Sequence, residues 1–197
     1  MFIKICGITT PSAAMTAIEC GVDAIGFVFA PSPRQLTPAQ AAELSAQLPP
    51  GLLRVAVTRH PSQRLVDDIL KQVQPDILQT DLQDLEHLEI PQALQVLPVV
   101  RGAFTGKITR RVLFEGALSG RGELSDWAAA AALASRTEVL LAGGLHAGNV
   151  AEAIQQVRPF GVDVSSGVES GPGVKDARRM AEFVTAVRSG FLRGSNV

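Results

Sequence analysis

Leu140-Leu141-Ala142-Gly143-Gly144-Leu145 is the stretch that decides the expected fold, together with Val162-Asp163-Val164-Ser165-Ser166-Gly167 later in the chain. Each is a short apolar run that changes into glycine or serine just before a segment able to open a helix. Glycine lets the backbone approach a ligand closely, and a helix N-terminus presents unpaired N–H groups with a favourable dipole. In a (β/α)8 barrel the loops after strands seven and eight usually hold phosphate. The two stretches therefore predict strands seven and eight of such a barrel, with six strands before them.

The rest of the chain alternates apolar segments with helix signals. Strands are predicted at 2–6, 24–29, 53–57, 75–79, 96–100, 111–115, 138–142 and 160–164. Thr10-Pro11 and Thr37-Pro38 each combine an N-cap residue with proline at the first helical position. Further helices are expected from Pro61, from Ser125 as the cap of an alanine-rich segment at 126–133, after Gly148-Asn149, and over 174–192. The segment 81–93 has leucines at helical spacing but is less clear.

Strict alternation of strands and helices predicts a parallel sheet, and eight units fit a closed barrel. An open doubly wound sheet would favour a Gly-x-Gly-x-x-Gly turn after the first strand, and Cys6-Gly7-Ile8-Thr9 does not supply it. We therefore predict a single (β/α)8 TIM barrel over residues 1–197. This length is short for a fold that typically takes about 250 residues, so the loops must be lean.

Composition narrows the class of protein. The chain of 197 residues is 46% hydrophobic with a formal charge of −1, and it has no basic block, which argues against nucleic acid as a partner. No apolar run approaches the roughly 18 residues of a membrane span, so no membrane partner is expected. The first residues lack the features of a signal peptide, and two cysteines give no disulfide framework. The expected location is the cytoplasm.

In this barrel, functional side chains gather where the strands end. A thiol, carboxylates, arginines and the two phosphate-type turns are expected on this rim: Cys6, Arg34, Gln79, Asp81, Arg101, Glu115, Gly143, Gly144, Asp163, Ser165 and Ser166. Such a set suits proton-transfer chemistry on a small phosphorylated anion.

Each of these residues can also be explained by a structural role alone. Cysteine is among the most buried residue types, so Cys6 alone can equally be a packing residue, and Cys20 in the first helix is expected to be one. Arg34 and Glu115 can be solvated charges, and the glycines and serines can be ordinary turn and cap residues. The three histidines lie near predicted helix ends at irregular spacing, which predicts no metal site: His60, His87 and His146.

Four motifs in a fixed order favour the functional interpretation of these residues over the structural one. They are Lys4-Ile5-Cys6-Gly7-Ile8-Thr9, Gly26-Phe27-Val28-Phe29-Ala30-Pro31-Ser32-Pro33-Arg34, Leu141-Ala142-Gly143-Gly144-Leu145, and Asp163-Val164-Ser165-Ser166-Gly167-Val168-Glu169 followed by Pro172-Gly173-Val174-Lys175-Asp176. With this order and spacing the chain resembles the phosphoribosylanthranilate isomerases of tryptophan biosynthesis, from residue 3 to about residue 190. Any one motif alone would be weak, whereas four together are specific.

The resemblance implies a cofactor-independent Amadori rearrangement of N-(5′-phosphoribosyl)anthranilate to 1-(2-carboxyphenylamino)-1-deoxyribulose 5-phosphate. It implies that a carboxylic acid on strand six, here Glu115, protonates the ribose ring oxygen, and that Cys6 removes the C2′ proton. Such an acid needs a proton near neutral pH, and such a base must be partly thiolate. By the same resemblance Arg34 holds the anthranilate carboxylate, and the other substrate-binding residues are Gln79, Gly143, Gly144, Asp163, Ser165 and Ser166.

Three departures from the family pattern leave alternatives open. The strand-six acid is usually aspartate but is Glu115 here, the glycine-rich loop is shortened to 119–122, and Gln79-Thr80-Asp81-Leu82 replaces the usual Gln-Leu-His-Gly. A related phosphosugar isomerase with an altered substrate is therefore a second hypothesis. A phosphate-ligand binding protein without turnover is a third, although a binder needs neither Cys6 nor Glu115. The sequence does not decide between a monomer and a homodimer.

Overall fold

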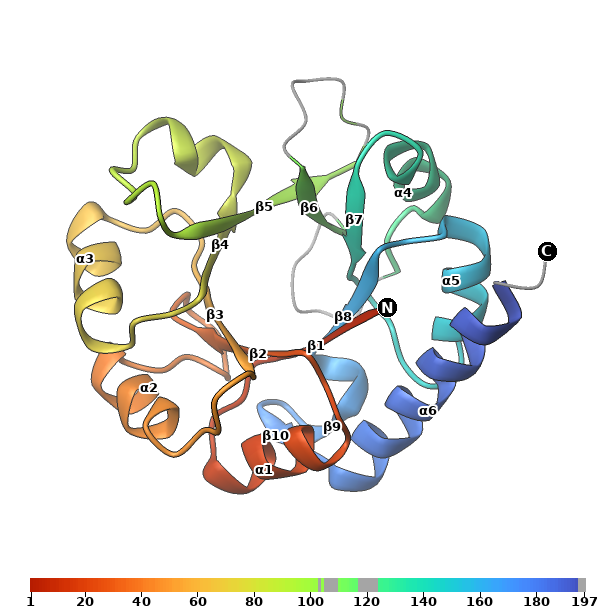
Figure 1. Cartoon of the computed structure of the whole chain (residues 1–197), viewed down its shortest axis with the longest axis horizontal. Coiled ribbons are helices and arrows are strands. Elements are labelled where there is room, and N and C mark those ends of the chain that lie inside the picture. The colour runs from red at the N-terminus through yellow and green to blue at the C-terminus, as the bar shows by residue number, and fades with distance from the viewer. Residues whose placement is uncertain (103, 105–109, 117–123, 195–197) are drawn as a thin grey trace.

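The computed structural model describes residues 1–102, 104, 110–116 and 124–194. Its eight parallel strands follow one another around a closed barrel, in which β1 pairs with both β2 and β8 (Figure 1). The strands are β1 (Phe2–Cys6), β2 (Ala24–Val28), β3 (Leu53–Val57), β4 (Ile77–Asp81), β5 (Gln95–Arg101), β6 (Arg111–Glu115), β7 (Glu138–Leu141) and β8 (Gly161–Val164). The predicted (β/α)8 barrel is confirmed.

Helices lie around the outside of this ring (Figure 1). They are α1 (Pro11–Glu19), α2 (Pro38–Ser45), α3 (Gln63–Gln72), α4 (Trp127–Ala134), α5 (Val150–Val157) and α6 (Ala177–Gly194). Alternate strand residues point inward and outward, so the apolar residues form two clusters. The larger packs strands against helices, and the smaller contains inward residues such as Val55, Leu113 and Leu140. No helix within the described ranges is both long and apolar enough to cross a membrane.

The two Thr-Pro signals identify helix starts correctly. Thr10 accepts a hydrogen bond from the backbone N of Ala13 at the start of α1. Thr37 and Gln40 form a reciprocal capping box at the start of α2. These caps satisfy N–H groups that the first helical turn leaves without a partner.

Two other helix starts differ from the prediction by one or two residues. Helix α3 begins at Gln63 rather than at Pro61, because the Ser62 side chain accepts from the backbone N of Leu65. The N-cap of α4 is Asp126 rather than Ser125, and its carboxylate accepts from the backbone N atoms at 128 and 129. Aspartate is as good a cap as serine, so the sequence does not show which of the two adjacent residues caps the helix.

The chain between β4 and β5 also differs from the prediction. Strand β4 continues to Asp81, so Asp81 belongs to the strand and shares an inward face with Gln79. After it comes η1 (Leu82–Glu86), a 3-10 helix rather than an α-helix. The carboxylate of Asp84 accepts hydrogen bonds from the Thr80 hydroxyl and the backbone N of His60, which holds this short segment against the barrel end. The shortened loop at 119–122 lies outside the described residues.

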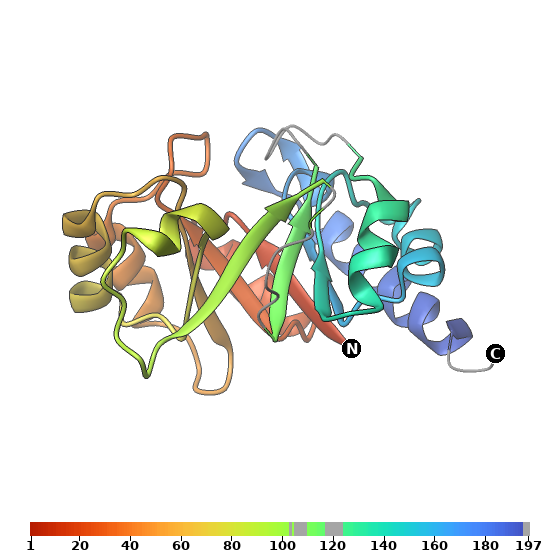
Figure 2. The same ribbon diagram turned by 90° about the horizontal axis from the view of Figure 1, so that it is seen from above.

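The sequence missed a hairpin after β8. Following the short 3-10 helix η2 (Ser166–Val168), β9 (Glu169–Gly171) pairs antiparallel with β10 (Val174–Lys175), and α6 begins only at Ala177. Figure 2 shows this hairpin at the end of the barrel opposite the N-terminus. Residues 174–175, which were predicted to open the closing helix, are therefore the second strand of this hairpin.

The corrected α4 cap gives a stability prediction. Asp126→Ala should lower the free energy of unfolding by about 0.5–2 kcal/mol, because two backbone N–H groups lose their acceptor. Ser125→Ala is the matched control. The buried Ser125 hydroxyl has no hydrogen-bond partner among the described residues, so its removal should not weaken the cap. Urea unfolding of both variants measures the difference, and equal losses would contradict the assignment.

Candidate active site

One cavity lies at the C-terminal ends of the strands and brings together every site residue that the sequence singled out. Its lining includes Cys6, Arg34, Gln79, Glu115, Gly143, Gly144, Asp163, Ser165 and Ser166. Asp81 and Arg101 line the same cavity. These residues come from strands or loops spread around the whole ring, so the barrel closure is what assembles them. The structure thus locates the site; the role of each residue is a separate question.

A buried ion pair lies beneath Cys6. Lys4 and Asp163 are register partners on β1 and β8, and Lys4 Nζ lies 2.8 Å from Asp163 Oδ1. The Lys4 side chain is 0% exposed. Burial acts to lower the pKa of Lys4, but Asp163 and then Cys6 outweigh it, so the pKa is raised and Lys4 stays charged. Burial raises the pKa of Asp163, with Lys4 opposing the shift.

Cys6 faces a balance of burial and positive charge. The side chain is two residues after Lys4 and therefore on the same inward face of β1. Burial raises the pKa of the Cys6 thiol above its ordinary value, while Lys4 and Lys175 act in the opposite direction and Asp163 adds to the rise. The resting cysteine is thus mainly a thiol, in contrast to the partly ionised base that its expected role requires.

The two phosphate-type turns are in direct contact. Gly143 and Gly144 follow β7 with φ angles of 91° and 63°, which glycine adopts without strain. A Cβ atom on Gly167 would lie 1.9 Å from the carbonyl oxygen of Leu145, so only glycine allows the loops after β7 and β8 to approach this closely. Ser165 Oγ also donates to the carbonyl of Cys6 at 3.1 Å. The turns form one continuous surface next to Cys6.

Glu115 is held by an arginine that the sequence had placed on the rim without a partner. Arg101 Nη2 donates to Glu115 Oε1 at 2.5 Å, and Arg101 Nη1 donates to Asp81 Oδ1 at 2.5 Å. Arg101 on β5 thus bridges the carboxylates of Asp81 on β4 and Glu115 on β6.

Asp81 also lies near His60 and Asp84, which the sequence did not group. One ligand atom from each of the three lies within 4.8 Å of the others. His60 Nδ1 is 2.8 Å from Asp84 Oδ1, and Arg101 forms an ion pair with Asp81.

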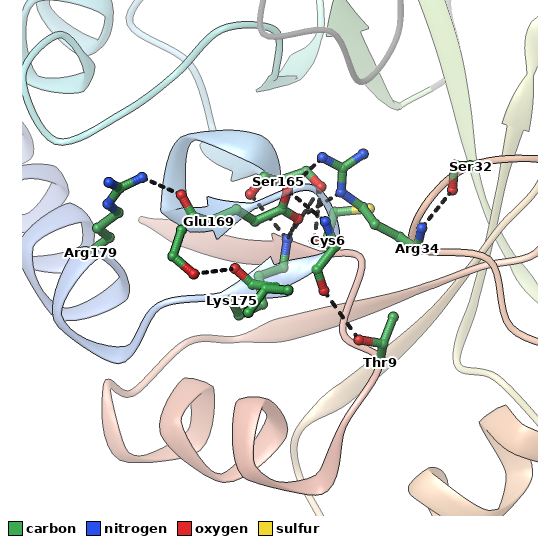
Figure 3. Close-up of polar contacts among 11 residues, drawn as sticks. Cys6, Thr9, Ser32, Arg34, Ser165, Glu169, Lys175 and Arg179 are labelled. Atoms are coloured by element: carbon green, nitrogen blue, oxygen red, sulfur yellow. Dashed lines mark hydrogen bonds and ion pairs between the residues drawn. The ribbon is translucent and has the colours of Figure 1, made fainter.

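Arg34 is neither solvated nor alone. Its Nε and Nη2 atoms donate to Glu169 Oε1 and Oε2, both at 2.7 Å, in a buried bidentate pair (Figure 3). Lys175 Nζ lies 2.7 Å from the same Glu169 Oε1. Sequence reasoning included Glu169 and Lys175 in a motif but gave them no role. The turn signal of Gly171-Pro172-Gly173 between them was the available hint of a hairpin.

Gln79 has a buried side-chain oxygen that is available to a ligand. It is 5% exposed, and its Oε1 atom has no hydrogen-bond partner within the described part of the chain. A buried acceptor without a partner is costly, because it has lost its water. Since Gln79 lines the cavity, a hydroxyl or N–H group of a ligand can fill this position.

The fold and the cavity define a class, namely a (β/α)8-barrel enzyme with a phosphate-type site at the end of β7 and β8. The model of one family, described as N-(5′-phosphoribosyl)anthranilate (PRA) isomerase, matches residues 3–186. The chain belongs to this family.

Individual relatives agree with the family match. An N-(5′-phosphoribosyl)anthranilate isomerase of Pseudomonas putida (strain W619) is 40% identical over 201 residues, covering 94% of this chain and 96% of the relative. The phosphoribosyl anthranilate isomerase structure from Thermotoga maritima is 30% identical with a TM-score of 0.83, covering 96% of this chain and 99% of that one. A further structure of such an isomerase, in complex with reduced 1-(o-carboxyphenylamino)-1-deoxyribulose 5-phosphate, has a TM-score of 0.81 at 30% identity over the same shares of the two chains.

The buried ion pair gives a second prediction. Lys4→Met should lower the free energy of unfolding by about 3–5 kcal/mol at pH 7, because it leaves the Asp163 carboxylate buried without its cation. Burial already raises the pKa of Asp163. The carboxyl group should therefore be protonated as the pH falls, and the loss in Lys4→Met should be smaller at pH 5 than at pH 7.

The matched control is the double variant Lys4→Met with Asp163→Leu, which leaves no buried charge and should recover most of the stability. Denaturant unfolding at both pH values measures the effect. A loss that does not depend on pH, or a double variant no more stable than Lys4→Met alone, would contradict this account.

Proposed function

We propose that this chain catalyses the Amadori rearrangement of N-(5′-phosphoribosyl)anthranilate to 1-(2-carboxyphenylamino)-1-deoxyribulose 5-phosphate. The observation that carries the proposal is the single cavity shared by a thiol, a carboxylic acid, an arginine and two phosphate-type turns. A barrel that only bound a phosphorylated ligand would need the turns but not Cys6 and Glu115. The complex of a related isomerase with a phosphorylated product analogue supports the same ligand class.

The phosphate end of the substrate is assigned to the turns after β7 and β8. Backbone N–H groups at Gly143, Gly144, Ser165 and Ser166 can surround one phosphate, because the contact between Gly167 and Leu145 brings the two turns together. At the other end, Arg34 holds the anthranilate carboxylate. The Nε and Nη2 atoms of Arg34 donate to Glu169. Within the described residues, Nη1 of Arg34 is left to donate to the ligand. Gln79 and Asp163 line the cavity between these ends and contact the ribose.

The chemistry needs one acid and one base on different atoms of the substrate. Glu115 gives a proton to the ribose ring oxygen, the C1′–O bond breaks, and the nitrogen lone pair forms a Schiff base at C1′. The Cys6 thiolate then takes the proton from C2′, and the resulting enolamine tautomerises to the ketone. No step requires a cofactor. A catalytic thiol must stay reduced, so a cytoplasmic setting is part of the proposal.

The first test compares Cys6→Ala with the native chain in a direct assay of product formation. The variant should lose about 10²–10⁴-fold in kcat, the usual contribution of a general base. Cys20→Ala is the matched control, since Cys20 lies on the edge of α1 outside the cavity lining and should keep its rate. Product affinity of Cys6→Ala should stay within a few fold.

The pH profile of the native chain belongs to the same test. Burial raises the pKa of Cys6 above its ordinary value of 9.0. Because the reaction needs the Cys6 thiolate and a proton on the acid at the same time, kcat/KM should not fall until Cys6 has ionised, so its alkaline limb should lie above pH 9.0.

The same assay separates the competing hypotheses, as does complementation of a tryptophan auxotroph that lacks this step. Tight binding of the reduced product without turnover would indicate a binding protein. Neither binding nor turnover would indicate a related isomerase with an altered substrate.

The second test concerns the acid. Glu115→Gln should abolish turnover, because the amide has no proton to give to the ring oxygen. Glu115→Asp should keep part of it, since misplacement by about 1 Å can cost on the order of 10²-fold. Asp126→Asn is the matched control, because asparagine also caps a helix and Asp126 is outside the cavity lining. Near-normal kcat for Glu115→Gln would transfer the acid role to Asp163, whose pKa burial raises.

A further inference from the structure

Glu169 has no role in the proposed chemistry, but its buried carboxylate contacts several groups of the site. Its side chain is 3% exposed, and both carboxylate oxygens accept from Arg34 at 2.7 Å. The backbone N of Gly173 donates to Oε2 at 3.2 Å. Burial acts to raise the pKa of Glu169, but hydrogen bonds from Arg34 and Lys175 outweigh it and hold the pKa below the usual range. Glu169 is therefore ionised, and it fixes the plane of the Arg34 guanidinium.

Lys175 ties this pair to the phosphate-type turn. Its Nζ atom donates to Glu169 Oε1 at 2.7 Å and to the backbone carbonyl of Ser165 at 3.0 Å. The Lys175 side chain is 1% exposed, and burial lowers its pKa while Glu169 opposes the shift. Figure 3 shows Glu169 between Arg34 and Lys175, with Cys6 beside them. With both cations charged, the cluster of Arg34, Glu169 and Lys175 carries one surplus positive charge, which an anionic ligand can balance.

The backbone is shaped to allow this cluster. A Cβ atom on Gly7, whose φ angle is 77°, would lie 2.4 Å from Cδ of Arg34, so glycine leaves the path of the arginine open. A Cβ atom on Gly173 would lie 2.7 Å from the carbonyl oxygen of Pro33. The β9–β10 hairpin therefore lies directly against the loop that carries Arg34, and Glu169 reaches the arginine across this contact.

We propose that Glu169 is a positioning residue that orients Arg34 toward the carboxylate of the substrate's aromatic ring, so that the β9–β10 hairpin sets the selectivity for a carboxylated aryl group. This inference rests on the proposed function, in which Arg34 binds that carboxylate. Glu169 acts through Arg34 and touches no reacting atom. Its effect should therefore fall on ligand affinity and KM rather than on the chemical step.

The experiment compares two ligands by isothermal titration calorimetry. One is reduced 1-(o-carboxyphenylamino)-1-deoxyribulose 5-phosphate, and the other is the same compound without the aromatic carboxylate. Glu169→Gln should weaken the carboxylated ligand by about 10- to 100-fold, the usual effect of losing a hydrogen bond to a charged group. It should leave the decarboxylated ligand within about twofold. In turnover, KM should rise while kcat changes only a few fold.

If Glu169 affected ligand binding only through its negative charge, the opposite result would be expected. Removing a negative charge near an anionic ligand should strengthen its binding, so equal or tighter binding of the carboxylated ligand to Glu169→Gln would overturn the proposal. Equal weakening of both ligands would also overturn it, because it would show a structural role only. Glu182→Gln is the matched control, since it removes the same charge from an exposed pair with Arg178 on α6.

Two further comparisons keep the result interpretable. Glu169→Asp keeps the charge but is one methylene shorter, so it should lose less selectivity than Glu169→Gln, and it replaces that variant if the glutamine chain does not fold. If the native chain binds the two ligands equally well, the assigned role of Arg34 is wrong and the positioning role falls with it. A native preference for the carboxylated ligand that Glu169→Gln retains in full would refute the positioning role alone.

Discussion

The arrangement of the site depends on one ion pair inside the barrel, between Lys4 and Asp163. The two residues are register partners on the first and last strands, so they meet where the ring closes. A lysine with no exposed surface cannot remain charged without a partner, and Asp163 can supply one only if β1 and β8 pair in this register. Cys6 ends β1 and Ser165 directly follows the end of β8, so the same pairing brings them together, and Ser165 Oγ donates to the carbonyl of Cys6. The position of the thiol beside the serine turn is thus a consequence of barrel closure.

Opposite charges from different strands hold the other functional groups as well. Arg34 is fixed by Glu169 from the hairpin after β8, and Glu115 is joined through Arg101 to Asp81 on β4. Each pair orients a side chain before any ligand arrives, which reduces the entropy that binding must lose. In the proposed reaction Cys6 must lose a proton, although burial raises the pKa of its thiol.

The sequence predicted the features that local patterns determine. Apolar runs gave the eight strands, and Thr10 and Thr37 gave two helix starts because cap and proline signals coincide there. At Ser125 and Asp126 two good caps are adjacent, so the pattern could not choose between them. The partner of Arg34 could not be predicted, because Glu169 lies 135 residues away and meets it only through a hairpin. The rim position of Glu115 was expected, but its bond to Arg101 depends on side-chain directions that a strand pattern does not fix.

The contact between Gly167 and Leu145 has a consequence for how this barrel can evolve. It joins the turns after β7 and β8 into one rigid unit, while Gln79, Asp81, Arg101 and Glu115 all come from β4, β5 and β6. A substitution on those three strands can change the lining of the cavity without touching the packed pair of turns. The cavity is thus lined on one side by turns that steric contact fixes and on another by strand ends that single substitutions can vary.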